Sequence, residues 1–147
     1  MTEQSQSVVV QQGVVPHLVV EGAADAIEFY KTAFGATEVM RMPAEDGKRL
    51  MHAAIIVNGS QIYLMDDFPE FREQCSGGRI VAPKTAGAST FVLHLNVPDC
   101  DAAVQRAIDA GAVVMMPPMD AFWGDRYGQV LDPFGHAWSF AHPLAKA

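Results

Sequence analysis

The sequence predicts an α+β fold built from two copies of a strand–helix–strand–strand–strand unit, written βαβββ. Two observations predict it. The same order of apolar and amphipathic segments occurs twice along the chain, and each copy has one helix-length amphipathic segment among shorter alternating ones. With 147 residues the chain is long enough for one full core and too short for two ordinary domains. We therefore expect both units to fold together as a single domain.

The repeat is clearest where each copy begins. Residues 14–39 read VVPHLVVEGAADAIEFYKTAFGATEV, and residues 91–114 read FVLHLNVPDCDAAVQRAIDAGAVV. Each segment contains an apolar strand with a central histidine, a short loop, an amphipathic helix, Gly-Ala and a second apolar strand. His17 corresponds to His94. An offset of 76 residues also aligns residues 58–67 with residues 134–143, so the repeat extends through both halves.

Each copy is expected to contain one helix with a single apolar face. In the first copy Ile27, Tyr30 and Phe34 lie at i, i+3 and i+7. Gly35 then supplies the left-handed residue that ends this helix. In the second copy Asp99 is positioned to cap the helix. The apolar face of this second helix is expected to consist of Val104, Ala107 and Ile108, with Gly111 at its end.

The strands after each helix are expected to pair through hairpins. Asn58-Gly59 lies between alternating runs and is a strong signal for a two-residue hairpin. Asp132–Gly135 is the corresponding turn in the second copy, with Asp132 as its cap. Pairing about Asn58-Gly59 places Ala54 opposite Tyr63.

This pairing separates two faces of each sheet, because side chains alternate along a strand. One face of the first copy is expected to carry His52, Ala54, Ile56, Gln61, Tyr63 and Met65, and the other face Ala53, Ile55, Ile62 and Leu64. In the last strand of the second copy Trp138 and Phe140 should pack against the helix. Ser139 is then left on the opposite face, where it is the counterpart of Tyr63.

The domain organisation follows from the repeat. A mobile tail is expected at residues 1–12, one domain at 13–147, and units at 14–67 and 90–143. The linker at 68–89 is rich in Gly, Pro and Ser and is longer than most loops, so both a solvated connection and a lid are open interpretations. Three carboxylates near its start are expected to be solvated: Asp66, Asp67 and Glu70.

Composition excludes several classes of function. The formal net charge is −7, from 10 Lys and Arg against 17 Asp and Glu, which argues against nucleic acid as the main partner. No apolar stretch approaches the length of a membrane span, and the start MTEQSQS lacks the features of a signal peptide. Cys75 and Cys100 form no CxxC pair, so we expect two free thiols and a cytoplasmic protein.

With these elements in place, the chain resembles the vicinal oxygen chelate superfamily, which includes glyoxalase I, fosfomycin- and bleomycin-resistance proteins and extradiol dioxygenases. The resemblance is carried by HLVVEGAADAIEFYKTAFG, LHLNVPDCDAA and DPFGHAWSF, within about residues 14–143. The stretch FWGDRYGQVLDPFGHAWSF is similar to the PhnB-like branch. The resemblance implies that the paired βαβββ modules form a cupped, eight-stranded, glyoxalase-like mixed sheet. It also implies a homodimer, in which two chains can share each site.

The resemblance further implies where a metal would bind. In metal-dependent members the ligands come from the first and last strands of each module, and the metal chelates two adjacent substrate oxygens. The first-strand positions fall on His17 and His94. The last-strand positions, commonly Glu, fall on Tyr63 and Ser139, and His52 is a candidate third nitrogen. A divalent metal such as zinc, nickel or manganese is one interpretation, and a metal-free pocket of hydrogen-bonded histidines is the other.

Further candidates come from the repeat register and the last hairpin. The predicted ligand-binding residues are Tyr63, Met65, Trp123, Arg126 and Ser139. Arg126 is expected on the cavity side, where it would bind an anion or a carbonyl group. The alternative is an ion pair with Asp125 or Asp132. Trp123 is expected either to stack on a planar ligand or to pack at a dimer surface.

Two functions remain open. The missing carboxylates favour a metal-free protein of the bleomycin-resistance type, which binds a hydrophobic or cationic small molecule and has no assignable reaction. The alternative is a divalent-metal-dependent glyoxalase-like lyase, isomerase or dioxygenase that uses His17 and His94, with Tyr63 as a proton donor. The chain has no glycine-rich strand–loop–helix for a nucleotide-like cofactor, so a methyltransferase is discounted.

Overall fold

The computed structural model describes residues 12–145 of the chain. The predicted mobile tail therefore lies outside the described residues, apart from Gln12. The side-chain amide of Gln12 donates to the carbonyl of Gln61 at 2.9 Å and accepts from its N–H at 2.7 Å. No helix within residues 12–145 has the length and apolar character needed to cross a membrane.

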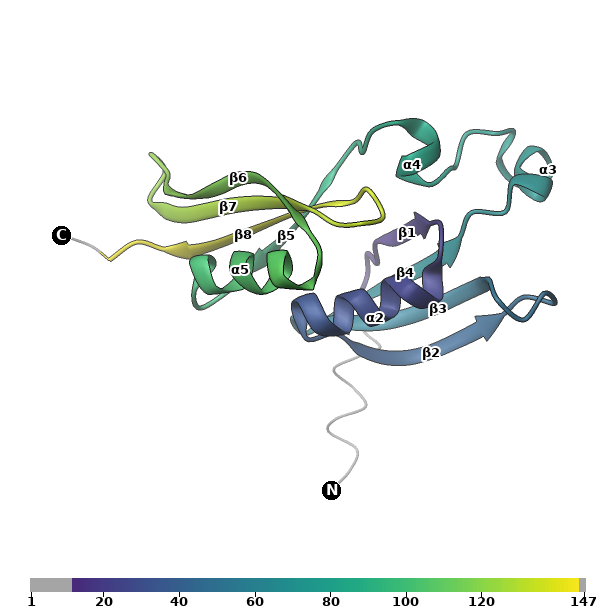
Figure 1. The fold of residues 1–147 in the computed structure, drawn as a ribbon, viewed down its shortest axis with the longest axis horizontal. Coiled ribbons are helices and arrows are strands. Elements are labelled where there is room, and N and C mark those ends of the chain that lie inside the picture. Colours follow the sequence, from purple (N-terminus) through teal and green to yellow (C-terminus); the bar gives the residue numbers. More distant parts are fainter. Residues whose placement is uncertain (1–11, 146–147) are drawn as a thin grey trace, which may run out of the picture.

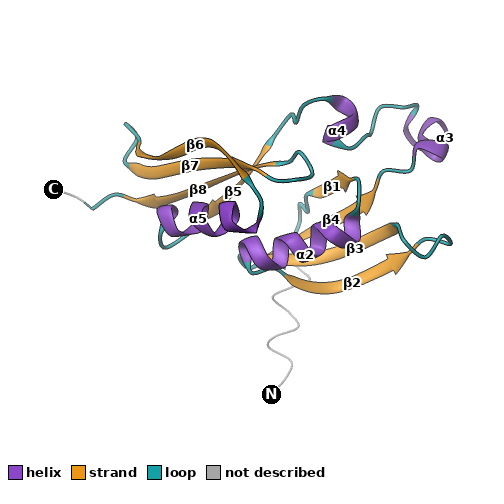
Figure 2. Ribbon diagram, in the orientation of Figure 1, coloured by secondary structure: helices purple, strands orange, loops and turns teal. Residues whose placement is uncertain are grey.

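The chain folds as two βαβββ modules, which confirms the predicted fold class (Figure 1, Figure 2). The first module contains β1 (His17–Val20), α2 (Ala23–Phe34), β2 (Thr37–Pro43), β3 (Leu50–Val57) and β4 (Ser60–Asp66). The second module contains β5 (Val92–Asn96), α5 (Cys100–Ala110), β6 (Val113–Asp120), β7 (Asp125–Leu131) and β8 (Ala137–Pro143). The connection between them contains the 3-10 helix η1 (Pro69–Phe71) and the short helices α3 (Arg72–Ser76) and α4 (Pro83–Ala86).

The eight strands are divided between two four-stranded mixed sheets, in the orders β1-β4-β3-β2 and β5-β8-β7-β6. In each sheet the first strand runs parallel to the last, and the other neighbours are antiparallel. The first hairpin has the predicted register, with Val57 opposite Ser60 and Ala54 opposite Tyr63. Asn58 and Gly59 adopt φ angles of 52° and 83°, as a two-residue hairpin with two left-handed residues requires.

One helix covers one face of each sheet (Figure 2). Ile27 and Tyr30 of α2 are fully buried, and Gly35 ends this helix with a φ of 70°. The predicted helix-facing side chains of the first sheet are also buried: Ala53, Ile55, Ile62 and Leu64. Each large apolar side chain buried in this way contributes roughly 1.5–3 kcal/mol. The second helix begins as predicted, because the carboxylate of Asp99 accepts the N–H of Ala102 at 3.1 Å.

The turn between β7 and β8 fixes the second module against the first. The hydroxyl of Tyr30 in α2 donates to Asp132 in this turn at 2.6 Å. Nε2 of His136, in the same turn, lies 2.9 Å from the carbonyl oxygen of Val19 in β1, so this nitrogen carries the proton and donates. The helices α2 and α5 also contact each other. The relative position of the two modules is therefore set by buried hydrogen bonds as well as by apolar packing.

Candidate functional site

The two first-strand histidines lie on the sheet faces that the helices leave uncovered. His17 lies opposite Tyr63 in the first sheet. In the second sheet His94 lies opposite Ser139, and Ser139 lies opposite Gln129. The predicted equivalence of Tyr63 and Ser139 is confirmed, because each is the last-strand neighbour of a first-strand histidine. The two histidines belong to separate sheets.

Three rings form a cluster in the first module. The ring centroids are 5.6 Å apart for His17 and His52, 5.9 Å for His17 and Tyr63, and 4.8 Å for His52 and Tyr63. Partial burial lowers the pKa of His17, and the charge of His52 lowers it further. The imidazole of His17 is therefore neutral at pH 7 and offers one N–H donor and one acceptor nitrogen.

His94 is held by hydrogen bonds instead. Its Nδ1 lies 2.7 Å from Oγ of Ser139, and its Nε2 lies 3.3 Å from Oδ1 of Asn96. An amide oxygen only accepts, so Nε2 carries the proton and Nδ1 accepts from the Ser139 hydroxyl. The ring of Tyr127 is stacked on His94 with an interplanar angle of 11°. Both ring nitrogens of His94 are thus engaged within its own module.

The donor set does not fit a metal site within one chain. His17 and His94 lie on separate sheets, and their last-strand neighbours present hydroxyl groups where a carboxylate would be the stronger ligand. Within residues 12–145, no three His, Cys, Asp or Glu side chains are arranged to hold a metal ion. Metal binding by His17 and His94, with His52 as a third ligand, stays a prediction.

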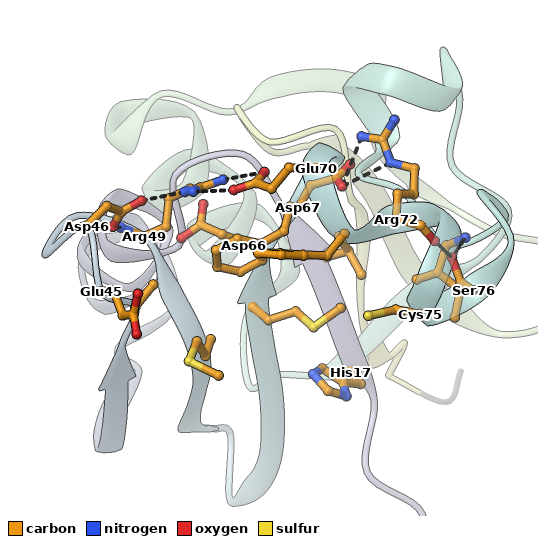
Figure 3. Close-up of a pocket in the computed structure, with 17 residues that line it drawn as sticks. His17, Glu45, Asp46, Arg49, Asp66, Asp67, Glu70, Arg72, Cys75 and Ser76 are labelled. Carbon is orange, nitrogen blue, oxygen red and sulfur yellow. Dashed lines mark hydrogen bonds and ion pairs between the residues drawn. The ribbon is translucent and has the colours of Figure 1, made fainter.

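A cavity of about 950 Å³ lies beside His17 in the first module (Figure 3). Its apolar wall is formed by Val19, Met51, Met65, Phe68, Phe71 and Ile80. Among the predicted site residues, His17 and Met65 line this cavity, and the others do not: His52, Tyr63, His94, Trp123, Arg126 and Ser139. The structure therefore brings only part of the predicted site together in one chain.

The carboxylates at the end of β4 are buried, which corrects the expectation that they are solvated. Asp66 is 2% exposed and Asp67 is 8% exposed. Asp66 accepts the N–H groups of Gly22 at 2.7 Å, Ala23 at 3.1 Å and Leu50 at 2.7 Å. These three donors offset the cost of removing the carboxylate from water. Asp66 thus caps α2, whose N-cap residue Gly22 has no side chain to do so.

Arg49 forms a charged cluster at the rim of the cavity with two carboxylates that sequence reasoning missed as site residues. Its guanidinium bonds Asp46 at 2.6 Å and both oxygens of Glu70 at 2.7 and 3.0 Å. The backbone N–H of Lys48, together with Arg49, holds the pKa of Asp46 at about 2. Arg49 also lowers the pKa of Glu70. All three rim groups are charged at neutral pH.

The second arginine of the cavity is paired as well. Arg72 donates to Asp67 at 3.0 Å. Glu45 also lines the cavity, and within the described residues it forms no ion pair. In Figure 3 the Arg49 and Arg72 groups lie along one rim, and His17 lies at the opposite side of the cavity.

Arg126 faces α5, which corrects its predicted position on the cavity side. Its guanidinium bonds both oxygens of Asp101 in α5, at 2.9 and 3.1 Å, and Asp120 at 3.0 Å. The alternative interpretation of an ion pair had the right interaction but named the wrong partners, Asp125 and Asp132.

The longer second hairpin explains this error. Ser139 and Tyr63 are 76 residues apart, but their neighbours Gln129 and Ala54 are 75 apart. Strand β7 is therefore displaced by one residue relative to the offset that aligns the last strands. A displacement of one residue reverses the two faces of a strand. The side chain of Arg126 consequently points toward the helix.

Asp132 caps its turn as predicted and also has a role that the sequence did not reveal. Its Oδ1 accepts the N–H groups of Phe134 at 2.8 Å and His136 at 3.0 Å. Its Oδ2 accepts from Tyr30 at 2.6 Å and from Nε1 of Trp138 at 2.8 Å. Burial raises the pKa of Tyr30 well above its usual range, and the negative charge of Asp132 adds to this. The tyrosine hydroxyl therefore stays protonated and donates.

Trp123 lies near the tip of the β6–β7 hairpin. It is 51% exposed, and its indole N–H donates to Asp125 at 3.0 Å. Its ring meets that of Tyr127 edge to face, with a centroid distance of 5.4 Å. A role for Trp123 in ligand stacking or in a dimer surface stays a prediction.

Comparison with known proteins supports the architecture described above. The uncharacterized protein Mb0911c of Mycobacterium bovis is 48% identical over 135 residues, which cover 92% of this chain and 86% of the relative. The crystal structure of TioX from Micromonospora sp. ML1 has 26% identity and a TM-score of 0.69, and covers 90% of this chain and 99% of that one. A PhnB protein from Bacillus cereus, titled as a putative 3-demethylubiquinone-9 3-methyltransferase, shares the fold. It has 18% identity and a TM-score of 0.62, and covers 91% of this chain and 100% of that one.

The family is shown by a match that spans most of the chain. Residues 10–140 match the sequence model of one superfamily. This range contains both βαβββ modules almost completely, together with His17, His94 and the residues of the cavity. The chain belongs to the glyoxalase/bleomycin resistance protein/dioxygenase superfamily.

Proposed function

We propose that the protein binds a small apolar molecule, neutral or positively charged, in the cavity of its first module. The observation that carries this proposal is an apolar cavity of about 950 Å³ whose two arginines are both paired with carboxylates. Membership of the superfamily supports a small-molecule site on this fold but does not select a reaction.

Apolar contact would supply most of the binding free energy. Pockets for small molecules are mostly apolar and contain a few polar groups that orient the ligand. Burial of ~200 Å² of apolar ligand surface stabilises a complex by about 5 kcal/mol, before the loss of translational freedom is subtracted. Met51, Met65 and Phe68 offer polarisable and aromatic surfaces for such contact.

The charges around the cavity disfavour an anionic ligand. The lining contains five carboxylates, Glu45, Asp46, Asp66, Asp67 and Glu70, and two guanidinium groups, Arg49 and Arg72, an excess of three negative charges. An anion would have to take Arg49 or Arg72 from a carboxylate that already binds it. His17 adds no positive charge, because its lowered pKa keeps it neutral.

His17 is the polar group best placed to orient the ligand. It lies across the cavity from the charged rim (Figure 3) and contacts the ring of Tyr63. Its neutral imidazole offers both a donor and an acceptor. We place His17 and Met65 together at the ligand-binding end of the cavity, with the ring of Tyr63 behind His17.

We also propose a homodimer in which the second module of one copy completes the site of the other. Two predicted ligand-binding residues of the second module, Trp123 and Ser139, do not line the cavity of their own chain. Strands β2 and β6 carry exposed apolar side chains, among them Met40, Met42, Met116 and Met119. Light scattering after gel filtration should give twice the mass of one chain, and a monomer at tens of micromolar would contradict this proposal.

The proposed compartment is the cytoplasm. Cys75 is exposed, Cys100 is buried, and both thiols are free. Free thiols are typical of a reducing compartment. Cell fractionation with an antibody against the native chain would test this.

Cys75 gives a test of ligand binding that uses the native chain. It lines the cavity and is exposed, whereas Cys100 is buried, and burial raises the pKa of its thiol. A ligand in the cavity should slow alkylation of Cys75 by iodoacetamide, measured by mass spectrometry of the peptides. The peptide of Cys100 serves as an unreactive internal reference.

Three probes that share a naphthalene ring but differ in charge test both whether the cavity binds a ligand and which charge it prefers. We expect 2-naphthylmethylamine and 2-naphthylmethanol to slow alkylation of Cys75 and to raise the melting temperature, and 2-naphthoate to do neither. Met65→Glu, which places a charge in the apolar wall, should abolish protection by the neutral probe. Val14→Glu is the control and should not, because Val14 is 84% exposed, does not line the cavity and lies outside β2 and β6. Failure of all three probes to protect Cys75 at millimolar concentration would overturn the proposal.

A further inference from the structure

We infer that residues 68–81 form a strap that closes the cavity and opens about Gly77-Gly78, and that Arg49 is the residue that holds the strap shut. The strap contains η1 and α3. It contributes Phe68, Phe71 and Ile80 to the apolar wall. The linker that the sequence left open as a connection or a lid thus contains a segment that covers the site.

Both ends of the strap are fixed through the buried residue Asp67. The N–H of Asp67 donates to the carbonyl of Val20 at 2.9 Å, which ties the start of the strap to β1. Oδ2 of Asp67 accepts the N–H of Ala82 at 2.8 Å, just after the strap ends. Oδ1 accepts from Arg72 at 3.0 Å. Asp67 holds both ends in place and also binds the side chain of Arg72 at the start of α3, so movement is confined to the residues between these points.

The body of the strap is not part of the hydrophobic core. No residue of η1 or α3 is buried. Phe71 is 54% exposed and Ile80 is 57% exposed, although both line the cavity. Segments with few buried apolar contacts open at low free energy. The strap can therefore move while the two sheets stay folded.

Two glycines provide the hinge. Gly77 and Gly78 follow α3 directly and have φ angles of 60° and 77°, in the region that favours glycine. A Cβ atom on Gly77 would meet no heavy atom within 4 Å. Glycine is therefore favoured there by its positive φ angle and not by a lack of space for a side chain. Hinges absorb changes of φ and ψ at a few such positions.

Arg49 crosses to the strap from the hairpin between β2 and β3. Its guanidinium binds both oxygens of Glu70 and lies 4.4 Å from the ring centroid of Phe68. Asp46 holds the guanidinium from its other side at 2.6 Å. A bidentate pair combined with an aromatic contact has a defined geometry, so it favours one closed position of the strap. Within the described residues, Arg49–Glu70 is the one ion pair that joins this hairpin to the strap.

The Arg49–Glu70 contact controls how often the cavity opens. The pair is exposed, and exposed ion pairs change equilibria by roughly two- to five-fold at most. The closed strap is thus favoured only modestly, which permits exchange of a ligand. The effect on ligand release rests on the proposed binding function, whereas the opening itself is a property of the free protein.

Hydrogen–deuterium exchange tests the strap without a ligand. We expect Arg49→Gln and Glu70→Gln to increase exchange in peptides from residues 68–81 by roughly two- to five-fold. Arg41→Gln is the matched control, because Arg41 binds Glu38 at 2.6 Å on β2 and does not line the cavity. The double change at Arg49 and Glu70 should have no more effect than Arg49→Gln alone, because Arg49→Gln already removes the contact with Glu70. Equal exchange in Arg49→Gln and Arg41→Gln would overturn the inference.

Ligand kinetics separate failure of the strap from failure of the binding function. Dissociation of the neutral dye N-phenyl-1-naphthylamine, followed by stopped-flow fluorescence, should be faster in Glu70→Gln than in Arg41→Gln. If the dye binds and strap exchange is unchanged in Glu70→Gln, the strap inference fails and the binding function stands. If strap exchange rises but neither this dye nor the naphthyl probes bind, the binding function fails and the strap stands.

Discussion

The two modules share one topology but differ in what surrounds the first-strand histidine. In the first module His17 has ring neighbours, His52 and Tyr63, and a lowered pKa. In the second module His94 is held by Ser139 at one ring nitrogen and by Asn96 at the other. The first histidine is thus presented to a cavity, while the second is engaged in the hydrogen bonding of its own sheet.

The repeat alone therefore does not determine the chemistry of a module. The strand position of the histidine is the same in both modules, because His17 lies opposite Tyr63 and His94 opposite Ser139. A serine hydroxyl is short enough to bond the neighbouring imidazole, whereas a tyrosine places its hydroxyl beyond it. The strap then covers the first module, beside His17.

The helix caps give the largest expected contrast between the modules. Asp66 accepts two N–H groups at the start of α2 and a third from Leu50 in β3, whereas the corresponding residue His142 accepts one, from Cys100 at the start of α5, at 2.8 Å. We expect Asp66→Ala to lower the free energy of unfolding by about 3 kcal/mol, because it leaves three N–H groups without a partner, and His142→Ala by about 1 kcal/mol. Urea denaturation measures both.

Asp66→Asn is the control for the cap. It keeps an acceptor oxygen and should cost less than Asp66→Ala. Equal losses for Asp66→Ala and His142→Ala would show that the two caps are equivalent, against the structure.

The histidines themselves give a smaller contrast. His94→Ala leaves the hydroxyl of Ser139, a residue that is 2% exposed, without its partner, so we expect a loss of about 1–2 kcal/mol in unfolding free energy. His17→Ala should change unfolding free energy by less than ~0.5 kcal/mol, because the side chain of His17 is only partly buried. Its main effect should be weaker binding of 2-naphthylmethanol. A larger stability loss for His17→Ala than for His94→Ala would contradict the comparison.

The smallest effect concerns the titration of His17. Its pKa is lowered first by burial and second by the charge of His52. In an NMR titration, the midpoint of His17 should lie below the ordinary value of about 6.5, and His52→Ala should raise it only part of the way back. The stability that His17 contributes is complete above pH 6.5 and is lost as the pH falls through its folded-state pKa. A full return to the ordinary value in His52→Ala would mean that charge, not burial, dominates.

Local signals predicted the modules well. Gly35, Asn58-Gly59 and Asp99 each determine the backbone within a few residues, so their helix end, hairpin and cap could be read directly. The face of the sheet on which Arg126 lies could not be predicted in this way. The offset of 76 residues that aligns the last strands does not hold for β7, which the longer second hairpin displaces by one residue.

The cavity could not be predicted for a different reason. Arg49 and Glu70 are 21 residues apart, and they meet because the strap folds back over the sheet. No periodic pattern marks such a pair. Asp66 and Asp67 look like surface residues in sequence, and only the N–H groups of α2, β3 and Ala82 show why they are buried.

We propose that the first module, and not the open face of the second, binds an apolar neutral or cationic molecule. The most direct test is a crystal of the protein soaked with 6-bromo-2-naphthylmethylamine and measured at the bromine absorption edge. We predict an anomalous peak inside the cavity, in contact with Met65 and beneath the strap. A peak confined to the surface around His94 and Trp123, or no ordered bromine at saturating probe, would contradict the account.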